Sequence, residues 1–438
     1  MTSEPQVVPL PRMASRRILR WPRALRERTT LVLGGSLIML LGSGMVSVAN
    51  FGYNVSMARL LGPAEFGHVT AVATLLLLAS AVTLSFQLVC AKFTARNSSS
   101  AGRAFIHDGL MRRAWIIGAA VGVGVIIASP IIAGLLRLPS PWLVVLLGIG
   151  LMFYPALGVK RGVLQGMCSF RQLSGNFVLE ALVKLVSAVF LVLVGFGTFG
   201  AVGGIAASLL AAFAVVRLQF SREASDQPVV PASFREAMQV IVFFVGQVVL
   251  SNIDILLVKH FFAPTEAGLY AAVALVGRLL YFAAWSIVSA MFPVSAGAEP
   301  ETKDNQVLLT PLMLVFGISV IYTAIMALFP RTIVGLLFGH GFLEAERLLS
   351  LYAMATGFYA LSVVLMTYEM SRKIVNTGWL QLAFSGLMVV AISVFHESLR
   401  QVVQVQLVVM ASLLVAVSLP FLRQLTARRP ASSLKEAA

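Results

Sequence analysis

Four charged residues lie within long stretches that are otherwise apolar: Glu180, Lys184, Asp254 and Arg278. Glu180 and Lys184 are four positions apart, so on one helix they share a face and can form an ion pair. Asp254 and Arg278 lie in two successive apolar stretches and could neutralise each other in the same way. Because an ionisable group inside a membrane is costly, these side chains are expected to face a polar interior.

The four charges have a structural and a functional interpretation. In the structural one, the two pairs only neutralise each other. In the functional one, Lys184 and Arg278 attract a phosphate within a hydrophilic cavity, since guanidinium groups favour bidentate phosphate contacts and an ammonium acts as a point charge. Asp254 and Glu180 would then bind a coupling proton or cation. Five amides could donate hydrogen bonds to sugar hydroxyls or simply bridge helices: Asn50, Asn54, Gln87, Gln247 and Asn252.

A short motif occurs twice, with 201 positions between the copies: Pro63, Glu65 and Gly67 in the first, Pro264, Glu266 and Gly268 in the second. Each copy joins the end of one apolar stretch to the start of the next through a Pro/Gly turn. Such an internal repeat indicates a chain built from two similar halves. We expect the two glutamates to shape the turns and charge the helix N-termini, and Arg59 to anchor the first helix at the outer membrane interface.

The composition indicates a membrane protein. The chain has 438 residues, of which 58% are hydrophobic and 12% charged, and its mean hydropathy is +0.90; a soluble domain carries about 25% charged residues. The net charge of +15 does not predict nucleic-acid binding, because no basic module interleaved with aromatic residues is present. The two cysteines and the scattered histidines lack metal-ligand spacing, so neither a metal nor a cofactor is expected.

Apolar runs of about 20 residues predict twelve membrane-spanning helices. We place them at about 31–58, 67–90, 114–136, 142–159, 174–195, 199–217, 237–260, 268–292, 307–329, 348–368, 375–395 and 401–422. The expected domains are a basic cytoplasmic arm (1–30), a six-helix bundle (31–217), a cytoplasmic linker (218–236), a second six-helix bundle (237–422) and a cytoplasmic tail (423–438).

The distribution of positive charge predicts the orientation of these helices. With the N-terminus inside, 25 Lys and Arg lie on the cytoplasmic side, Arg161 among them in the loop after the fourth helix, and six lie outside. Cytoplasmic loops of membrane proteins carry an excess of Lys and Arg, so both termini are expected in the cytoplasm. Halves with an even number of helices insert the same way round, related by an axis along the membrane normal.

Three stretches carry a family resemblance: Ala58-Arg59-Leu-Leu-Gly62-Pro63-Ala-Glu65-Phe-Gly67, Arg161-Gly-Val-Leu-Gln165-Gly166-Met-Cys-Ser-Phe170 and Asp254-Ile-Leu-Leu-Val-Lys259. They resemble motifs of the polysaccharide (O-antigen type) flippases of the multidrug/oligosaccharidyl-lipid/polysaccharide exporter superfamily. The resemblance covers about 31–422, nearly the whole chain.

The resemblance implies an all-α, V-shaped membrane transporter of twelve helices in two pseudo-symmetric six-helix bundles, alternating between inward-open and outward-open states. Its cargo would be an undecaprenyl-diphosphate-linked oligosaccharide, moved from the cytoplasmic to the periplasmic leaflet of the bacterial inner membrane for surface polysaccharide, exopolysaccharide or lipopolysaccharide biosynthesis. The implied partners are this lipid-linked oligosaccharide and the lipid bilayer, with a polysaccharide polymerase and a chain-length regulator as further candidates.

Two other functions remain open from the residues alone. A multidrug or organic-cation exporter of the same superfamily predicts a cavity dominated by carboxylates, whereas two acids and two bases lie within the spans here. A membrane polymerase or glycosyltransferase needs a sizeable outer catalytic loop, and the longest outer connection, about 330–347, is poor in catalytic pairs. We therefore expect a transporter rather than an enzyme.

Overall fold

A computed structural model describes residues 23–97, 99–218, 220, 242, 245–297, 306–372 and 377–426. Regular structure within these ranges is entirely helical. The expected arm before Arg23, nearly all of the 218–236 linker and the tail beyond Thr426 lie outside the described residues.

The first half of the chain holds seven elements. They are α1 (Arg23–Arg96), α2 (Ser100–Ile127), α3 (Ser129–Leu135), α4 (Trp142–Gly166), α5 (Phe170–Leu191), the π-helical η1 (Val192–Phe196) and α6 (Gly197–Val215). The helix α1 is two helices joined at Gly62, whose φ of 75° lies in the left-handed region that glycine tolerates. Pro63 then opens the second helix, where its missing N–H costs nothing. The turn therefore reverses the chain where the first copy of the repeat predicts it.

The second half holds eight elements with assigned bounds. They are α8 (Ile253–Phe261), α9 (Pro264–Gly297), α10 (Gln306–Leu328), α11 (Pro330–Phe338), η2 (His340–Ala345), α12 (Glu346–Arg372), α13 (Thr377–Val394) and α14 (Leu399–Thr426). A turn at Ser251-Asn252 separates α8 from helical residues 245–250, so the expected helix 237–260 is interrupted. The expected outer connection at 330–347 is itself helical, as α11 and η2.

The protein is an all-helical, multi-pass membrane protein. Eight helical stretches among the described residues are long and apolar enough to cross a bilayer. Two of them, Ile38–Arg96 with 59 residues and Phe170–Val215 with 46, far exceed one crossing, which takes about 20 residues. Large apolar side chains such as Leu40, Val186 and Val408 are exposed, as expected for a surface that contacts lipid tails.

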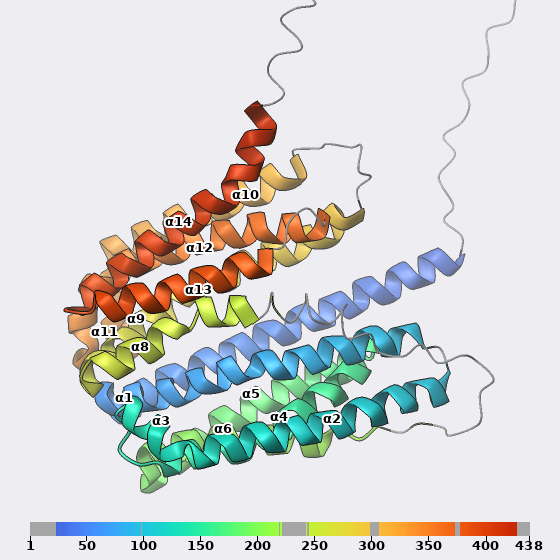
Figure 1. The fold of residues 1–438 in the computed structure, drawn as a ribbon, viewed down its shortest axis with the longest axis horizontal. Coiled ribbons are helices and arrows are strands. Elements are labelled where there is room, and N and C mark those ends of the chain that lie inside the picture. Colours follow the sequence, from blue (N-terminus) through green and yellow to red (C-terminus); the bar gives the residue numbers. More distant parts are fainter. Residues whose placement is uncertain are drawn as a thin grey trace, which may run out of the picture.

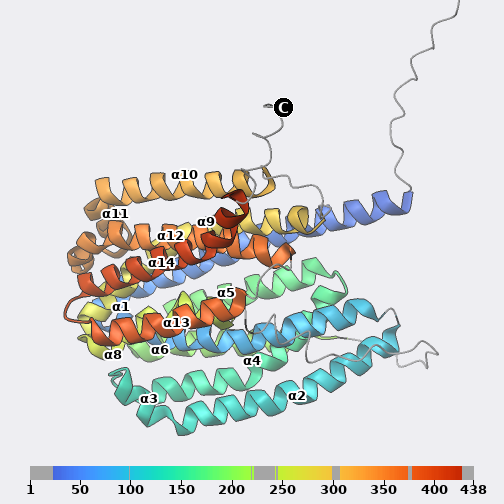
Figure 2. The same ribbon diagram turned by 45° about the horizontal axis from the view of Figure 1, so that its top comes forward.

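The helices form two lobes, which we define as the N-lobe (α1 to α6) and the C-lobe (residues 245–426). Figures 1 and 2 show the lobes converging at the end where α1 turns and where α3, α8 and α11 lie. We call this the seam end. Toward the opposite end, which holds Arg96 and Arg372, the ribbons of the two lobes diverge (Figure 1).

At the seam end the two copies of the repeat touch each other. A Cβ atom on Gly67 would lie 2.8 Å from the carbonyl oxygen of Pro264, and one on Gly268 would lie 1.8 Å from that of Pro63. Phe66 of α1 packs edge-on against Phe342 of η2, with ring centroids 5.9 Å apart. The repeated glycines therefore allow the second half of α1 and the start of α9 to cross in backbone contact.

Candidate functional site

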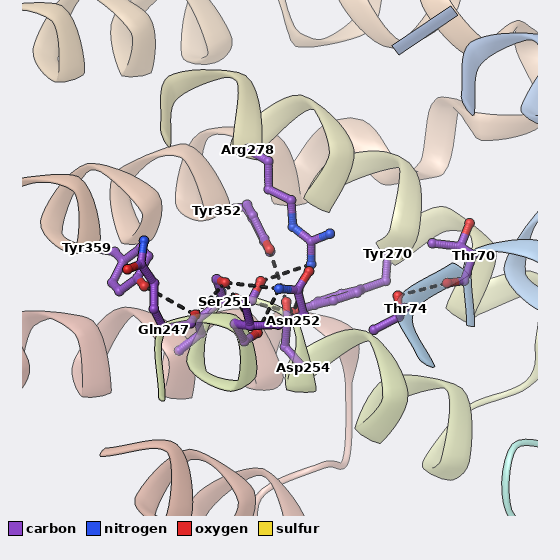
Figure 3. Close-up of polar contacts among 12 residues, drawn as sticks. Thr70, Thr74, Gln247, Ser251, Asn252, Asp254, Tyr270, Arg278, Tyr352 and Tyr359 are labelled. Atoms are coloured by element: carbon purple, nitrogen blue, oxygen red, sulfur yellow. Dashed lines mark hydrogen bonds and ion pairs between the residues drawn. The ribbon is translucent and has the colours of Figure 1, made fainter. Parts of the chain in front are cut away.

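A buried carboxylate organises the polar centre of the C-lobe. Asp254 is 1% exposed and lies in the first turn of α8. One of its oxygens, Oδ2, accepts hydrogen bonds from the hydroxyls of Tyr270, at 2.8 Å, and Tyr352, at 3.0 Å. The Tyr270 hydroxyl also lies 3.1 Å from Oε1 of Gln406 on α14. The helices α8, α9 and α12 thus meet at one carboxylate (Figure 3), and α14 joins them through the contact between Gln406 and Tyr270.

Arg278 of α9 approaches the same carboxylate less closely. Its Nη2 lies 3.8 Å from Oδ1 of Asp254 and donates a 3.0 Å hydrogen bond to the Ser251 carbonyl (Figure 3). That carbonyl lies at the turn before α8, where the helical hydrogen-bond ladder is interrupted. The Nε of Arg278 is buried and has no hydrogen-bond partner among the described residues. The expected Asp254–Arg278 ion pair is therefore present, but it is loose.

A cavity of about 130 Å³ lies beside Arg278. Leu77 of the N-lobe contributes to its wall, and the C-lobe supplies polar and aromatic groups that include Asn252, Gln406, Tyr352 and Thr356. Tyr281 and Tyr359 also line it and stack with their centroids 5.6 Å apart. Sites for whole drug-sized ligands have about 300–1,000 Å³, so this cavity fits one polar group of a larger ligand.

Asn252 stabilises the turn that positions this centre. Its amide donates to the Val248 carbonyl at 2.7 Å and to the Ser251 hydroxyl at 3.0 Å, while the residue still lines the cavity. Those bonds compensate for the missing helical hydrogen bonds at the turn. The role of Asn252 in the described contacts is to shape the backbone beside Arg278.

The N-lobe holds a second polar group. Lys184 of α5 donates to Oδ1 of Asn50 on α1, and its Nζ lies 5.1 Å from the ring centroid of Tyr53. Asn54 donates to the Asn50 carbonyl at 2.8 Å. Lys184 therefore has an amide as its hydrogen-bonding partner, although the charge of Glu180 still acts on it. The expected Glu180–Lys184 ion pair does not form.

Glu180 is instead paired with Arg161, at 2.5 Å. Arg161 is 2% exposed, donates through Nε to Asn176 at 2.7 Å and lies 4.1 Å from the ring centroid of Phe177. The expectation that Arg161 belongs to a cytoplasmic loop is wrong, because α4 continues to Gly166.

A glycine pattern could have predicted this extension of α4. Gly158, Gly162 and Gly166 recur at intervals of four, and a Cβ atom on each would lie 2.5 Å from a carbonyl oxygen of α1. Small residues at this spacing let two membrane helices approach closely. The close contact with α1 continues to Gly166, so α4 stays helical beyond Arg161, and the arginine is buried against α5.

The residues of the repeat hold helix ends. Glu266 accepts a 3.1 Å bond from the backbone N–H of Ala263 and so caps α9. Glu65 accepts from the Thr198 hydroxyl at 3.2 Å, which ties α1 to the start of α6. Arg59 donates to the Leu336 carbonyl and, at 2.8 Å, to the Leu337 carbonyl. Arg59 therefore binds the end of α11 in the other lobe.

The fold is similar to known transporter structures. The lipid II flippase MurJ in an inward closed conformation matches with a TM-score of 0.71 and 11% identity, covering 88% of this chain and 87% of that one. An inward-facing multidrug resistance MATE family transporter of the MOP superfamily matches with a TM-score of 0.66 and 14% identity, covering 91% and 99%. A MOP superfamily transporter from Pyrococcus furiosus matches with a TM-score of 0.57 and 17% identity, covering 91% and 96%.

At these identities the structural matches establish the fold alone. The comparison with curated protein sequences found no match. The family comparison did: the family described as polysaccharide biosynthesis protein matches residues 32–298, more than half of the chain. The chain has a MATE/MurJ transporter fold and belongs to the polysaccharide biosynthesis protein family.

Proposed function

We propose that this protein is a flippase for an undecaprenyl-diphosphate-linked oligosaccharide. It carries the cargo from the cytoplasmic to the periplasmic leaflet of the bacterial inner membrane by alternating access, for surface polysaccharide or exopolysaccharide biosynthesis. The family match supports the link to polysaccharide, and the fold supports transport. The MurJ match concerns a lipid-linked cargo in that protein, and the proposal extends this class of cargo to the present chain.

The architecture we propose has twelve crossings in two bundles, 31–217 and 237–422, with both termini in the cytoplasm. Charge supports this orientation. The end opposite the seam carries Lys92, Arg96 and Arg372, and a basic end faces the cytoplasm. The seam end is then periplasmic, and it is the end at which the two lobes are in contact.

The observation that carries the proposal is Arg278 at the wall of the cavity, held loosely by Asp254. Both tyrosine hydroxyls already satisfy one oxygen of Asp254. Arg278 makes no hydrogen bond to the other oxygen, Oδ1, and only faces it at 3.8 Å, so turning to a phosphate oxygen breaks an ion pair but no hydrogen bond to Asp254. An arginine–phosphate contact is charge-assisted and geometrically specific, so it suits the diphosphate of the cargo.

The remaining polar residues take supporting roles in this proposal. Lys184 and Asn50 would contact the cargo from the N-lobe, with Asn54 holding the backbone at Asn50. In the C-lobe, Asn252 would hold the turn beside Arg278. Protonation or cation binding at Asp254 would release Arg278 and so couple transport to an ion gradient. Glu180 is the second candidate for coupling, but its pairing with Arg161 makes it a weaker one than Asp254.

An organic-cation exporter is less well supported by this geometry. Such a site needs a carboxylate free to meet the cation. Asp254 already faces Arg278, and Glu180 faces Arg161. The same transport experiment distinguishes the two cargos when ethidium replaces the labelled lipid.

A leaflet-accessibility assay tests the proposal. The full-length protein is reconstituted in liposomes with undecaprenyl-diphosphate-linked oligosaccharide that carries a fluorescent label on the sugar. A membrane-impermeant quencher should then reach the inner-leaflet pool much faster than in protein-free liposomes. Equal rates with and without protein, or transport of ethidium but not of the labelled lipid, would overturn the flippase assignment.

A further inference from the structure

The seam end contains two contacts related by the internal repeat. Arg59 donates to the carbonyls of Leu336 and Leu337 at the end of α11. His260 donates through Nδ1 to the carbonyl of Leu135 at the end of α3, at 2.6 Å. The two donors are 201 positions apart, and so are Leu135 and Leu336. Each lobe therefore reaches across to the short helix of the other.

We call these contacts the α1–α11 seam and the α8–α3 seam. Next to the hydrogen bonds of Arg59, the α1–α11 seam is lined by apolar side chains. Ala58, Leu269 and Phe338 are 1%, 5% and 3% exposed and belong to one hydrophobic core cluster. In this seam the two lobes therefore pack against each other with an apolar side chain at each of these three positions.

The α8–α3 seam has a basic residue at each equivalent position. At the offset of 201 positions, Ala58 corresponds to Lys259, Leu269 to His68 and Phe338 to Arg137. Contacts on either side bring the three to one crossing of the lobes. Lys259 precedes His260, which binds the Leu135 carbonyl two residues before Arg137. His68 follows Gly67, whose Cβ position lies 2.8 Å from the Pro264 carbonyl oxygen.

Two of these three groups are buried without a hydrogen-bond partner. Lys259 is 1% exposed and His68 is 8% exposed. Neither Nζ of Lys259 nor Nδ1 of His68 has a partner among the described residues. Arg137 lies exposed at the rim, with φ at 46° in the left-handed region that non-glycine residues seldom adopt. A buried cation without a partner is strongly unfavourable, and the α1–α11 seam shows that packing does not require one.

We propose that Lys259, His68 and Arg137 form a binding site for a phosphate-type oxyanion. The anion enters past Arg137, whose planar guanidinium suits two phosphate oxygens. Lys259 and His68 then supply the donors that lack partners in the closed seam. The hydrogen bond between His260 and Leu135 is the contact that must loosen for the anion to enter. The site is separate from Arg278 and does not rest on the flippase assignment.

Phosphate chemistry at this depth has two sources. The seam lies at the ends of α3 and α8, and an anionic phospholipid whose headgroup reaches this end can present its phosphate there. The phosphate of a transported molecule can also pass the same point. The test therefore has two arms: one with inorganic pyrophosphate and one with lipid.

The experiment measures the melting temperature of the full-length protein in nanodiscs. In the first arm the lipid is phosphatidylcholine only, and sodium pyrophosphate is titrated against sodium chloride of equal ionic strength. In the second arm phosphatidylglycerol replaces part of the phosphatidylcholine. The variants are Lys259→Ala, His68→Leu and Arg137→Phe, which place the residues of the α1–α11 seam in the α8–α3 seam. Arg331→Ala removes one exposed positive charge at the same end and serves as the control.

We expect pyrophosphate to stabilise the native protein and the Arg331→Ala control. For Lys259→Ala and Arg137→Phe the midpoint concentration should rise roughly tenfold or more, the effect of losing one charge-assisted bond. Stabilisation by phosphatidylglycerol alone, lost in the same variants, would assign the site to a lipid headgroup. The proposal is overturned if neither probe stabilises the native protein, or if the seam variants respond as the control does. Arg137 is exposed, so Arg137→Ala gives the same readout if a buried substitution prevents folding.

Discussion

Arg278 has fewer firm contacts than a largely buried arginine needs. Of its nitrogens, Nη2 donates to Ser251, while Nε is buried without a partner among the described residues. Its distance of 3.8 Å to Asp254 is longer than a charge-assisted hydrogen bond, which takes about 2.7–2.9 Å. A guanidinium with unused donors at a cavity wall is poised to bind an anion.

Substitution of Arg278 should therefore affect transport more than stability. Arg278→Ala should lower the initial rate of lipid-linked oligosaccharide translocation roughly tenfold or more, because a hydrogen bond to a charged group contributes about 1.5–3 kcal/mol. Arg278→Lys keeps the charge but loses the planar fork, so it should retain an intermediate rate. Rates are measured in the leaflet-accessibility assay, and Arg331→Ala is the control. Native rates in both Arg278 variants would remove the arginine from the cargo path.

Asp254 should determine how transport responds to an ion gradient. Asp254→Asn preserves the shape of the side chain and an oxygen for Tyr270 and Tyr352, but it cannot take up a proton or hold a cation by charge. We expect the variant to transport without the acceleration that an imposed proton or sodium gradient gives the native protein. The exposed Glu397→Gln is the matched control. A variant that still responds fully to the gradient would assign Asp254 a structural role.

Sequence reasoning finds the ionisable residues of this site but not all of their partners. Asp254 and Arg278 stand out because charge inside an apolar stretch is rare. Tyr270, Tyr352 and Gln406 do not, since their position around one carboxylate depends on how α8, α9, α12 and α14 pack. The same limit explains Glu180: its helical neighbour Lys184 is visible in the sequence, whereas Arg161 reaches it from another helix.

Helix ends and crossings at the seam depend on glycine. The turn of α1 uses Gly62 in a left-handed conformation, and α11 ends at Gly339, with φ at 92°. Where α1 meets α9, Gly67 and Gly268 have no side chain, so the two backbones are in direct contact. The closed seam end is therefore built from elements that tolerate no Cβ atom at these crossing points.

Gly268→Ala should destabilise the closed seam end. The added methyl would lie 1.8 Å from the Pro63 carbonyl oxygen, and overpacking of this kind costs about 1–3 kcal/mol. We expect the lobes to separate there, so that a cysteine at Ala58, which is 1% exposed in the closed seam, reacts several times faster with an impermeant maleimide in a protein with Cys90 and Cys168 replaced by alanine. Gly124→Ala, which meets nothing within 4 Å, should leave the labelling rate unchanged. Identical rates in the two alanine variants would show that the crossing does not control this end.

The apolar runs predict most helices because length and hydropathy alone decide which segments enter a bilayer. They predict helix ends less well. The helix α4 continues beyond the end of its apolar run. Arg161 is buried there, and Lys160 donates to the carbonyls of Phe213 and Val216 at the end of α6. The helices α11 and η2 lie where polarity predicts a loop, since Phe338 and Phe342 pack into the seam end. Long-range contacts that no local pattern contains determine these ends.

The whole molecule is held closed at the seam end by contacts between the lobes. The glycine crossing, the Phe66–Phe342 contact and the bonds from Arg59 and His260 all lie there. The cavity beside Arg278 takes one wall residue, Leu77, from the N-lobe. If transport proceeds by alternating access, these contacts must break in every cycle, and a covalent link across them must stop it.

A cysteine pair across the seam end tests this requirement. The side chains at positions 63 and 341 touch across the seam end, since a Cβ atom on Gly341 would lie 3.6 Å from Cδ and 3.7 Å from Cγ of Pro63. A disulfide needs Cβ atoms about 3.5–4.5 Å apart, and a small shift of the two turns brings cysteines at these positions to that distance. In a protein with Cys90 and Cys168 replaced by alanine, we expect Pro63→Cys/Gly341→Cys to form a disulfide on oxidation. Translocation should then fall roughly tenfold or more and return with dithiothreitol, because a covalent link holds the closed state against any thermal opening.

Each single cysteine variant controls for oxidation and should transport at the same rate with and without oxidant. The extent of cross-linking is measured by mass spectrometry on the same liposomes, so that activity is compared with the linked fraction. If activity falls in proportion to that fraction, opening of the seam end is an obligatory step. Full translocation by a completely linked protein would exclude it and would require the cargo to leave by a path outside the two lobes.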